Sequence, residues 1–213
     1  MRLLAGFALL AGAALAQVGI TESIDLKGLK AAVADYKGRK AIELTEIAGG
    51  PADGGLCILK REQMQDGALE VWVAGEPGPG AGTAARGFVG VAFRVRPGGE
   101  KYEAFYLRPT NGRAEDQVRR NHSLQYISHP DHHWQRLRKE FPEKYESYAD
   151  LVPGEWTKMR VEVKGRQARL FVNGTSQPNL IVNDLFLGED GGGIALWVGP
   201  GTVARFADFV VVR

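Results

Sequence analysis

Cysteine is almost absent from the 213-residue sequence, which excludes a fold held together by internal disulfides. The single cysteine, Cys57, lies in the apolar run Leu56–Leu59, and this setting predicts a buried, unreactive thiol rather than a nucleophile. The domain must therefore be stabilised by its hydrophobic core. A chain of this length with 44% hydrophobic residues can bury such a core.

A strong excess of one charge sign is also missing. The chain has 27 basic and 25 acidic residues, a formal net charge of +2 and a sequence pI near 8.7. A dedicated nucleic-acid-binding domain needs a much stronger positive field. We therefore expect no nucleic acid among its partners.

Long hydrophobic runs are lacking beyond residues 1–16. This segment, MRLLAGFALLAGAALA, has a basic start, an apolar stretch and the small-residue ending Ala14-Leu15-Ala16. The pattern predicts a secretory signal peptide cleaved before Gln17, because the run is too short to cross a bilayer. We expect a secreted or periplasmic protein whose mature chain, residues 17–213, has no membrane span.

Helical periodicity is weak, whereas the two-residue alternation of β-strands recurs along most of the chain. We expect at most one amphipathic turn around Leu26–Val33. The charged segment Trp134–Tyr148 is interpreted as a solvated surface segment, with a lid over the face as the alternative, and Pro142 should interrupt any helix in it. Strands are predicted at residues 41–46, 56–60, 68–73, 88–96, 101–108, 124–128, 157–164, 168–172, 193–198 and 203–212.

These strands are separated by glycine-rich turns, and they show neither a βαβ alternation nor a fixed repeat. The Gly/Pro-rich stretch 75–87 is interpreted as a loop within one domain, because the alternation resumes directly at Phe88. The pattern predicts a single all-β domain. We expect a two-sheet antiparallel β-sandwich, a jelly roll of roughly 10 to 14 strands.

Two C-terminal stretches carry a family resemblance: GEWTKMRVEVKGRQARLFVNG and GGGIALWVGPGTVARFADFVV. Their order of strands and turns resembles the concanavalin A-like lectin/glucanase superfamily, and within it the laminin-G-like and 3-keto-disaccharide-hydrolase-like domains. The segment GFVGVAFRV…KYEAFYLRP looks like the central strands of that fold. The resemblance spans about residues 41–213 and implies a ligand on the concave face or its rim.

The resemblance is stronger for fold than for activity, because this fold serves lectins, glycosidases, lyases and adhesion modules. The E-x-D-x-x-E strand motif of family 16 glucanases is missing. The glutamates of ELTEI, LEVW and VEVK are too isolated to place two carboxylates on one face. An acidic calcium loop of the laminin-G type is not evident either.

All four histidines lie between Asn121 and Trp134. This stretch and the strand before it combine flat rings with planar polar groups, which suits sugar recognition, and arginine forks also suit carboxylates. The predicted ligand-binding residues are Tyr102, Arg108, Arg113, Arg119, Arg120, Asn121, Gln125, Tyr126, His129 and Trp134. The alternative interpretation is a solvated loop of ordinary polar composition.

A catalytic role in this stretch would fall to His122 as general base, with Tyr106 and Asp116 beside it. Glu103 is a second carboxylate that could pair with His122. The two-residue alternation places His122 on the side of Leu124, Tyr126 and Ser128. The later histidines, His129, His132 and His133, have a spacing that predicts no metal site, and no cofactor is expected.

Three functions remain open at this point. The first is an exported domain that binds a glycan or oligosaccharide. The second is a glycan-degrading enzyme, either a glycoside hydrolase or a lyase-like enzyme that cleaves 3-keto-glycosides. The third is a laminin-G-like module that recognises a protein. The oligomeric state does not follow from the sequence.

Overall fold

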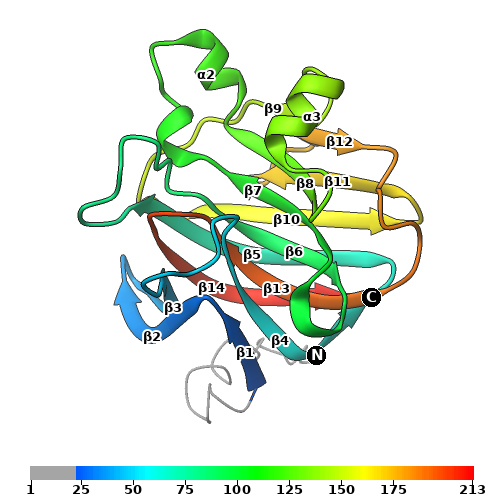
Figure 1. The fold of residues 1–213 in the computed structure, drawn as a ribbon, viewed down its shortest axis with the longest axis horizontal. Coiled ribbons are helices and arrows are strands. Elements are labelled where there is room, and N and C mark those ends of the chain that lie inside the picture. The colour runs from blue at the N-terminus through cyan, green and yellow to red at the C-terminus, as the bar shows by residue number, and fades with distance from the viewer. Residues whose placement is uncertain (1–22) are drawn as a thin grey trace, which may run out of the picture.

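The computed structural model describes residues 23–213, so the predicted signal peptide lies outside the described residues. Two seven-stranded sheets pack face to face (Figure 1). The first sheet has the order β1-β4-β13-β6-β7-β8-β9 and the second the order β12-β11-β10-β5-β14-β3-β2, and all of their strand pairs are antiparallel. The predicted two-sheet jelly-roll sandwich is therefore confirmed.

The first sheet contains β1 (Ile24–Lys27), β4 (Gly55–Met64), β6 (Val89–Val95), β7 (Tyr102–Leu107), β8 (Leu124–His129), β9 (Glu146–Ser147) and β13 (Gly192–Val198). The second contains β2 (Leu29–Tyr36), β3 (Arg39–Glu46), β5 (Gly67–Pro77), β10 (Thr157–Lys164), β11 (Gln167–Val172), β12 (Leu180–Val182) and β14 (Thr202–Val212). Short helices are η2 (Pro97–Gly99), η3 (Pro109–Asn111), α2 (Gln117–Asn121) and α3 (Trp134–Glu140). No helix within residues 23–213 is long and apolar enough to span a membrane.

The core lies between the two sheets and follows the alternation seen in the sequence. On β10, Met159, Val161 and Val163 are buried, whereas the residues between them are charged and point outward. On the first sheet, Val91 and Phe105 occupy paired positions on the inner side. Cys57 is buried on the inner side too, and burial raises its pKa to about 12, which fits the prediction of an unreactive thiol.

Two local expectations were wrong or incomplete. The segment around Leu26–Val33 is not an amphipathic turn but the end of β1 and the start of β2, separated by Gly28 with a φ of +69°. The charged segment after Trp134 does contain a helix, α3, which ends at Glu140 before Pro142. Its Leu137 is fully buried, and this anchors the helix on the protein.

Candidate functional site

The outer face of the first sheet carries aromatic residues where a solvated face would carry polar ones. Tyr106 of β7 and Trp197 of β13 both align with Gly90 of β6, the strand between them. Because Gly90 has no side chain, the two rings meet above it, stacked at a centroid distance of 4.5 Å and an angle of 23°. A Cβ at Gly90 would lie 2.6 Å from the Cβ of Tyr106, so this position requires glycine.

The stacked pair continues along the sheet into a row of rings, formed by Tyr102, Tyr106, His129 and Trp197. Trp197 Nε1 donates to the Tyr102 hydroxyl at 3.2 Å. Tyr102 stacks on His129, its partner in the β7–β8 register, at 4.7 Å and 6°. The two tyrosines and the tryptophan are at most 3% exposed. The ring row is therefore a rigid platform beneath the surface rather than a surface that can itself stack on a sugar.

Next to the ring row, two arginines and a histidine surround one carboxylate. This Glu146 cluster consists of Arg108, His122, Arg138 and Glu146. Arg108 donates to Glu146 at 3.2 Å, and Arg138 donates to both carboxylate oxygens through Nε at 2.9 Å and through Nη2. His122 Nε2 lies 3.6 Å from the same carboxylate. Arg108 also donates to the Tyr106 hydroxyl at 3.0 Å, which links the cluster to the ring row.

The cluster holds its carboxylate ionised and its histidine neutral. Burial alone would raise the pKa of Glu146, but the hydrogen bonds from Arg138 and the charges of Arg108 and Arg138 outweigh it and lower the pKa. Burial lowers the pKa of His122, helped by the two arginines and opposed by Glu146. At neutral pH the two arginines and one carboxylate leave a net positive charge at the cluster.

Trp134 supplies the exposed aromatic surface beside this charge. It is the first residue of α3 and is 37% exposed. The Arg138 guanidinium lies 4.7 Å from its ring centroid and that of Arg108 lies 5.7 Å away. The predicted ligand residues Arg108, Gln125 and Trp134 thus come together with the predicted catalytic residues His122 and Tyr106.

Gln125 has a supporting place in this group. It lies opposite Tyr106 in the β7–β8 register and is fully buried. Its Oε1 accepts from Arg108 at 2.9 Å, and its Nε2 donates to the carbonyls of Tyr126 and Tyr145. Gln125 therefore fixes the Arg108 guanidinium from below, and a ligand on the surface does not reach it.

Other predicted site residues lie on or near α2, where their side chains bond to the protein itself. Asp116 caps this helix, because its Oδ1 accepts from the Arg119 backbone N–H at 2.7 Å. Arg119 and Arg120 hold the preceding loop through Asn111 and the Ala114 carbonyl. On the surface, Arg113 pairs with Asp150 at 2.7 Å and Asn121 accepts from Gln117 at 2.7 Å. The carboxylate next to His122 is Glu146 rather than the predicted Asp116.

Tyr126 lies apart from the Glu146 cluster, on the opposite side of the sheet. It is fully buried on the inner side of the sheet, where it donates to Glu103 at 2.7 Å. Glu103, also fully buried, faces Arg94 at 3.4 Å, so it cannot assist His122 either. His122 ends α2 and is not part of β8, so its side chain does not follow the alternation that includes Tyr126.

The three later histidines are divided by the structure. His132 stacks on Phe186 at 3.8 Å. His129 and His133 contact each other instead, with their rings edge to face at 5.1 Å, next to Asp53 from the β3–β4 loop. Burial lowers the pKa of both His129 and His132. His129, His132 and His133 therefore lie in two separate environments.

Sequence reasoning missed Glu146 and Arg138, which the cluster depends on. Both lie in the charged segment that was interpreted as solvated, and no local pattern distinguishes them from the neighbouring Glu143 and Lys139. Trp197 had a signal, because it alternates with the buried Leu196 and Val198 and so had to lie on the opposite face.

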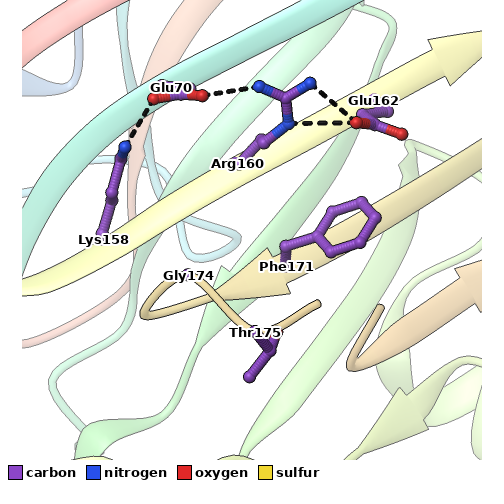
Figure 2. Close-up of a pocket in the computed structure, with 7 residues that line it drawn as sticks. All are labelled: Glu70, Lys158, Arg160, Glu162, Phe171, Gly174 and Thr175. Carbon is purple, nitrogen blue, oxygen red and sulfur yellow. Dashed lines mark hydrogen bonds and ion pairs between the residues drawn. The ribbon is translucent and has the colours of Figure 1, made fainter. Parts of the chain in front are cut away.

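The second sheet also has a depression on its outer face, with an open volume of about 380 Å³ (Figure 2). Its charges are already paired with one another: Glu70 contacts Lys158 at 2.7 Å and Arg160 at 2.6 Å, and Arg160 contacts Glu162 at 2.8 Å. Phe171, Gly174 and Thr175 complete the lining. Since its cations and carboxylates satisfy each other, this depression is a weaker candidate than the Glu146 cluster despite its volume.

No protein-family model matches the chain, and no curated protein matches it. Solved structures do match in fold. The carbohydrate-binding module CBM66 from Bacillus subtilis is 12% identical with a TM-score of 0.57, covering 89% of this chain and 98% of that one. A protein of unknown function with a galectin-like fold from Bacillus subtilis is 11% identical with a TM-score of 0.56, covering 90% of each chain.

A third match is the cellulose-induced protein Cip1, which is 10% identical with a TM-score of 0.55 and covers 90% of this chain and 91% of that one. At such identities these likenesses show the fold. They agree with the concanavalin A-like jelly roll that the order of strands and turns in the sequence resembles.

Proposed function

We propose that this chain is an exported carbohydrate-binding domain that holds a glycan against Trp134 and the Glu146 cluster. The observation that carries the proposal is the pairing of a 37% exposed tryptophan with two arginines and a histidine around one buried carboxylate. A flat ring can stack on a sugar face while the adjacent guanidinium and imidazole groups bind its hydroxyls. The fold likeness to a carbohydrate-binding module supports this use of the sandwich, and the pattern of residues 1–16 supports export.

The charge of the cluster supports a glycan that carries carboxylate groups, such as a uronate-containing oligosaccharide. Arg138 is only partly buried, with 35% of its side chain exposed, so its guanidinium has surface left for a ligand. Burial lowers the pKa of Arg86, and the charges of the nearby Arg119 and Arg108 lower it further. Arg86 therefore extends the positive field along this end of the sandwich. Arginine recognises a planar carboxylate through two parallel hydrogen bonds.

Hydrolysis receives less support than binding. Glycoside hydrolases generally use two carboxyl groups flanking the bond they cleave, one of them often with a raised pKa. Glu146 is the carboxylate that the cluster contains, and two arginines hold its pKa low. His122 remains the residue that would act as a base if the bound glycan were cleaved.

The test is a glycan screen on the full chain that includes matched neutral and uronate-containing oligosaccharides. We expect a binding signal, and we expect Trp134→Ala and Arg138→Ala each to weaken the best hit at least about tenfold, close to 1.4 kcal/mol. Phe171→Ala, in the depression of the second sheet, is the matched control and should leave the affinity unchanged. Loss of affinity only in the Phe171 variant would place the site on the other face.

Incubation of the best hit with the protein, followed by product analysis, separates binding from catalysis. We expect the oligosaccharide to be recovered intact. A cleaved product that disappears in His122→Ala would establish the enzyme alternative. Equal loss of neutral and uronate hits in Arg138→Ala would keep the glycan site but remove the preference for carboxylates.

A further inference from the structure

The geometry points to a binding site for one divalent transition-metal ion of the zinc class, formed by Asp53, His129 and His133. His129 and His133 are close in the sequence, whereas Asp53 comes from a distant part of the chain. Asp53 lies in the β3–β4 loop, His129 ends β8 and His133 precedes the first turn of α3. One ligand atom of each lies within 4.8 Å of the other two, and His133 Nε2 is 3.7 Å from Asp53 Oδ2.

A second observation points to a ligand at the same place. His129 Nδ1 is buried and has no hydrogen-bond partner among the described residues. The imidazole cannot easily turn to find one, because it is stacked face to face on Tyr102 at 4.7 Å and is contacted at its edge by His133. A polar atom that is buried without a partner is rare in proteins, and an ion bound at Nδ1 would give this atom the partner it lacks.

The donor set fits zinc better than the hard cations. Two imidazoles and a carboxylate are typical ligands of zinc, whereas calcium and magnesium prefer oxygen atoms alone. Bond lengths near 2.0–2.2 Å place the ligand atoms of a tetrahedral site about 3.3–3.5 Å apart. Only a small closure is therefore needed, and the Asp53 side chain, which is 53% exposed, is free to supply it. The fourth position would be open to water or to a ligand oxygen.

The spacing of His129, Asp131, His132 and His133 in the sequence predicted no metal site within this stretch. His132 does point away, stacked on Phe186, as the spacing rule requires. The third ligand comes instead from Asp53, which no local motif could reveal.

Metal binding would join the two loops that cover the ring row. Gly54, next to Asp53, packs on Trp197, since a Cβ there would lie 2.9 Å from its Cζ2. An ion shared by Asp53 and His133 would therefore fix the β3–β4 loop over Trp197 and tie it to the start of α3. The prediction is a metal-dependent gain in stability, with a melting temperature higher by about 5–10 °C when zinc is 100-fold above its dissociation constant.

The experiment titrates zinc chloride into the chelator-treated full chain, expressed without a polyhistidine tag, and follows the heat of binding. We expect one zinc per chain. His133→Ala should weaken binding by more than about 100-fold and Asp53→Asn by at least tenfold, because even residues that only orient a metal ligand contribute about 10–100-fold. Cobalt bound in place of zinc should give the visible absorption of a four-coordinate site in the wild type but not in His133→Ala.

His132→Ala is the matched control, because it removes the adjacent imidazole and leaves the three ligands in place. Its zinc affinity should stay within about twofold of the wild type. Thermal unfolding without metal checks that Asp53→Asn and His133→Ala remain folded, as expected for two partly exposed side chains. The proposal is overturned if the wild type binds no zinc, or if His132→Ala weakens binding as much as His133→Ala does.

Discussion

The outer faces of the two sheets are built in opposite ways. On the second sheet, Arg160 of β10 forms ion pairs with Glu70 of the neighbouring β5 and with Glu162 of its own strand, and all three remain partly exposed to solvent. On the first sheet, the corresponding face carries Tyr106 and Trp197, which are almost completely buried. Gly54 of the β3–β4 loop packs on Trp197, and Arg108 links Tyr106 to Trp134 of α3. The outer face of the second sheet is thus stabilised by ion pairs, whereas that of the first sheet is stabilised by further packing of buried rings.

This difference makes the first sheet the better candidate for ligand recognition. Exposed ion pairs contribute little to folding and leave few groups unsatisfied for a ligand. A buried platform costs more to build, but it fixes the groups at its edge in one geometry, which is what a binding site needs. Trp134 and Arg138 are such edge groups, since they rest on the buried Arg108 and Glu146.

The largest expected effect compares one tryptophan from each face. Trp197→Ala should lower the free energy of unfolding by about 3–5 kcal/mol, because it removes a buried ring stacked on Tyr106. Trp72→Ala on the second sheet should cost only about 1–2 kcal/mol, since that half-buried ring mainly contacts the Arg39 guanidinium at 4.0 Å. Denaturant unfolding of both variants measures the difference. Equal losses would contradict the contrast between the faces.

A smaller effect compares two arginines, each changed to methionine so that most of the side-chain volume is kept. Arg108→Met should lower the free energy of unfolding by about 3 kcal/mol, because the buried Glu146, Gln125 and Tyr106 lose a shared donor. Arg160→Met should change it by less than about 1 kcal/mol, because its pairs with Glu70 and Glu162 are partly exposed. The two denaturation curves, measured at the same pH and salt, test this. A loss in Arg160→Met as large as that in Arg108→Met would refute it.

The contrast also explains what the sequence could and could not predict. Strand positions and the two-sheet fold followed from local alternation, as on β10, because burial of every second residue leaves a periodic trace. The grouping of Tyr106, Arg108 and His122 in one candidate site was predicted from their nearness in the chain. A contact between residues that are distant in the sequence, such as that of Glu146 with His122, leaves no pattern in the sequence.

The errors in the predicted site have physical reasons as well. Asp116 and Arg119 looked available for ligands, but a helix N-terminus and its loop needed their hydrogen bonds. Tyr126 was predicted to bind a ligand because of its flat ring. Alternate side chains of β8 point into the core, however, and Tyr126 is one of them. Composition alone does not distinguish polar groups used by the fold from those left for a ligand.

The smallest expected effect is a dependence of stability on pH that differs between the faces. The pKa of His122 is lowered in the folded state, chiefly by burial, so the unfolded chain binds a proton more readily near pH 6. Stability is then fully present above the ordinary histidine pKa of about 6.5 and is lost as the pH falls through the lower folded value. With a chelator present, the melting temperature should fall between pH 7.5 and 5.5.

His122→Gln should reduce this fall, since glutamine does not titrate. Glu70→Gln on the second sheet is the control. The pKa of Glu70 is lowered by hydrogen bonds from Lys158 and Arg160, so its contribution is lost only at more acidic pH, below about 4.5. That variant should leave the change between pH 7.5 and 5.5 unaltered. A melting temperature that stays flat or rises towards pH 5.5 in the wild type would show that His122 is not held neutral by its burial beside Glu146.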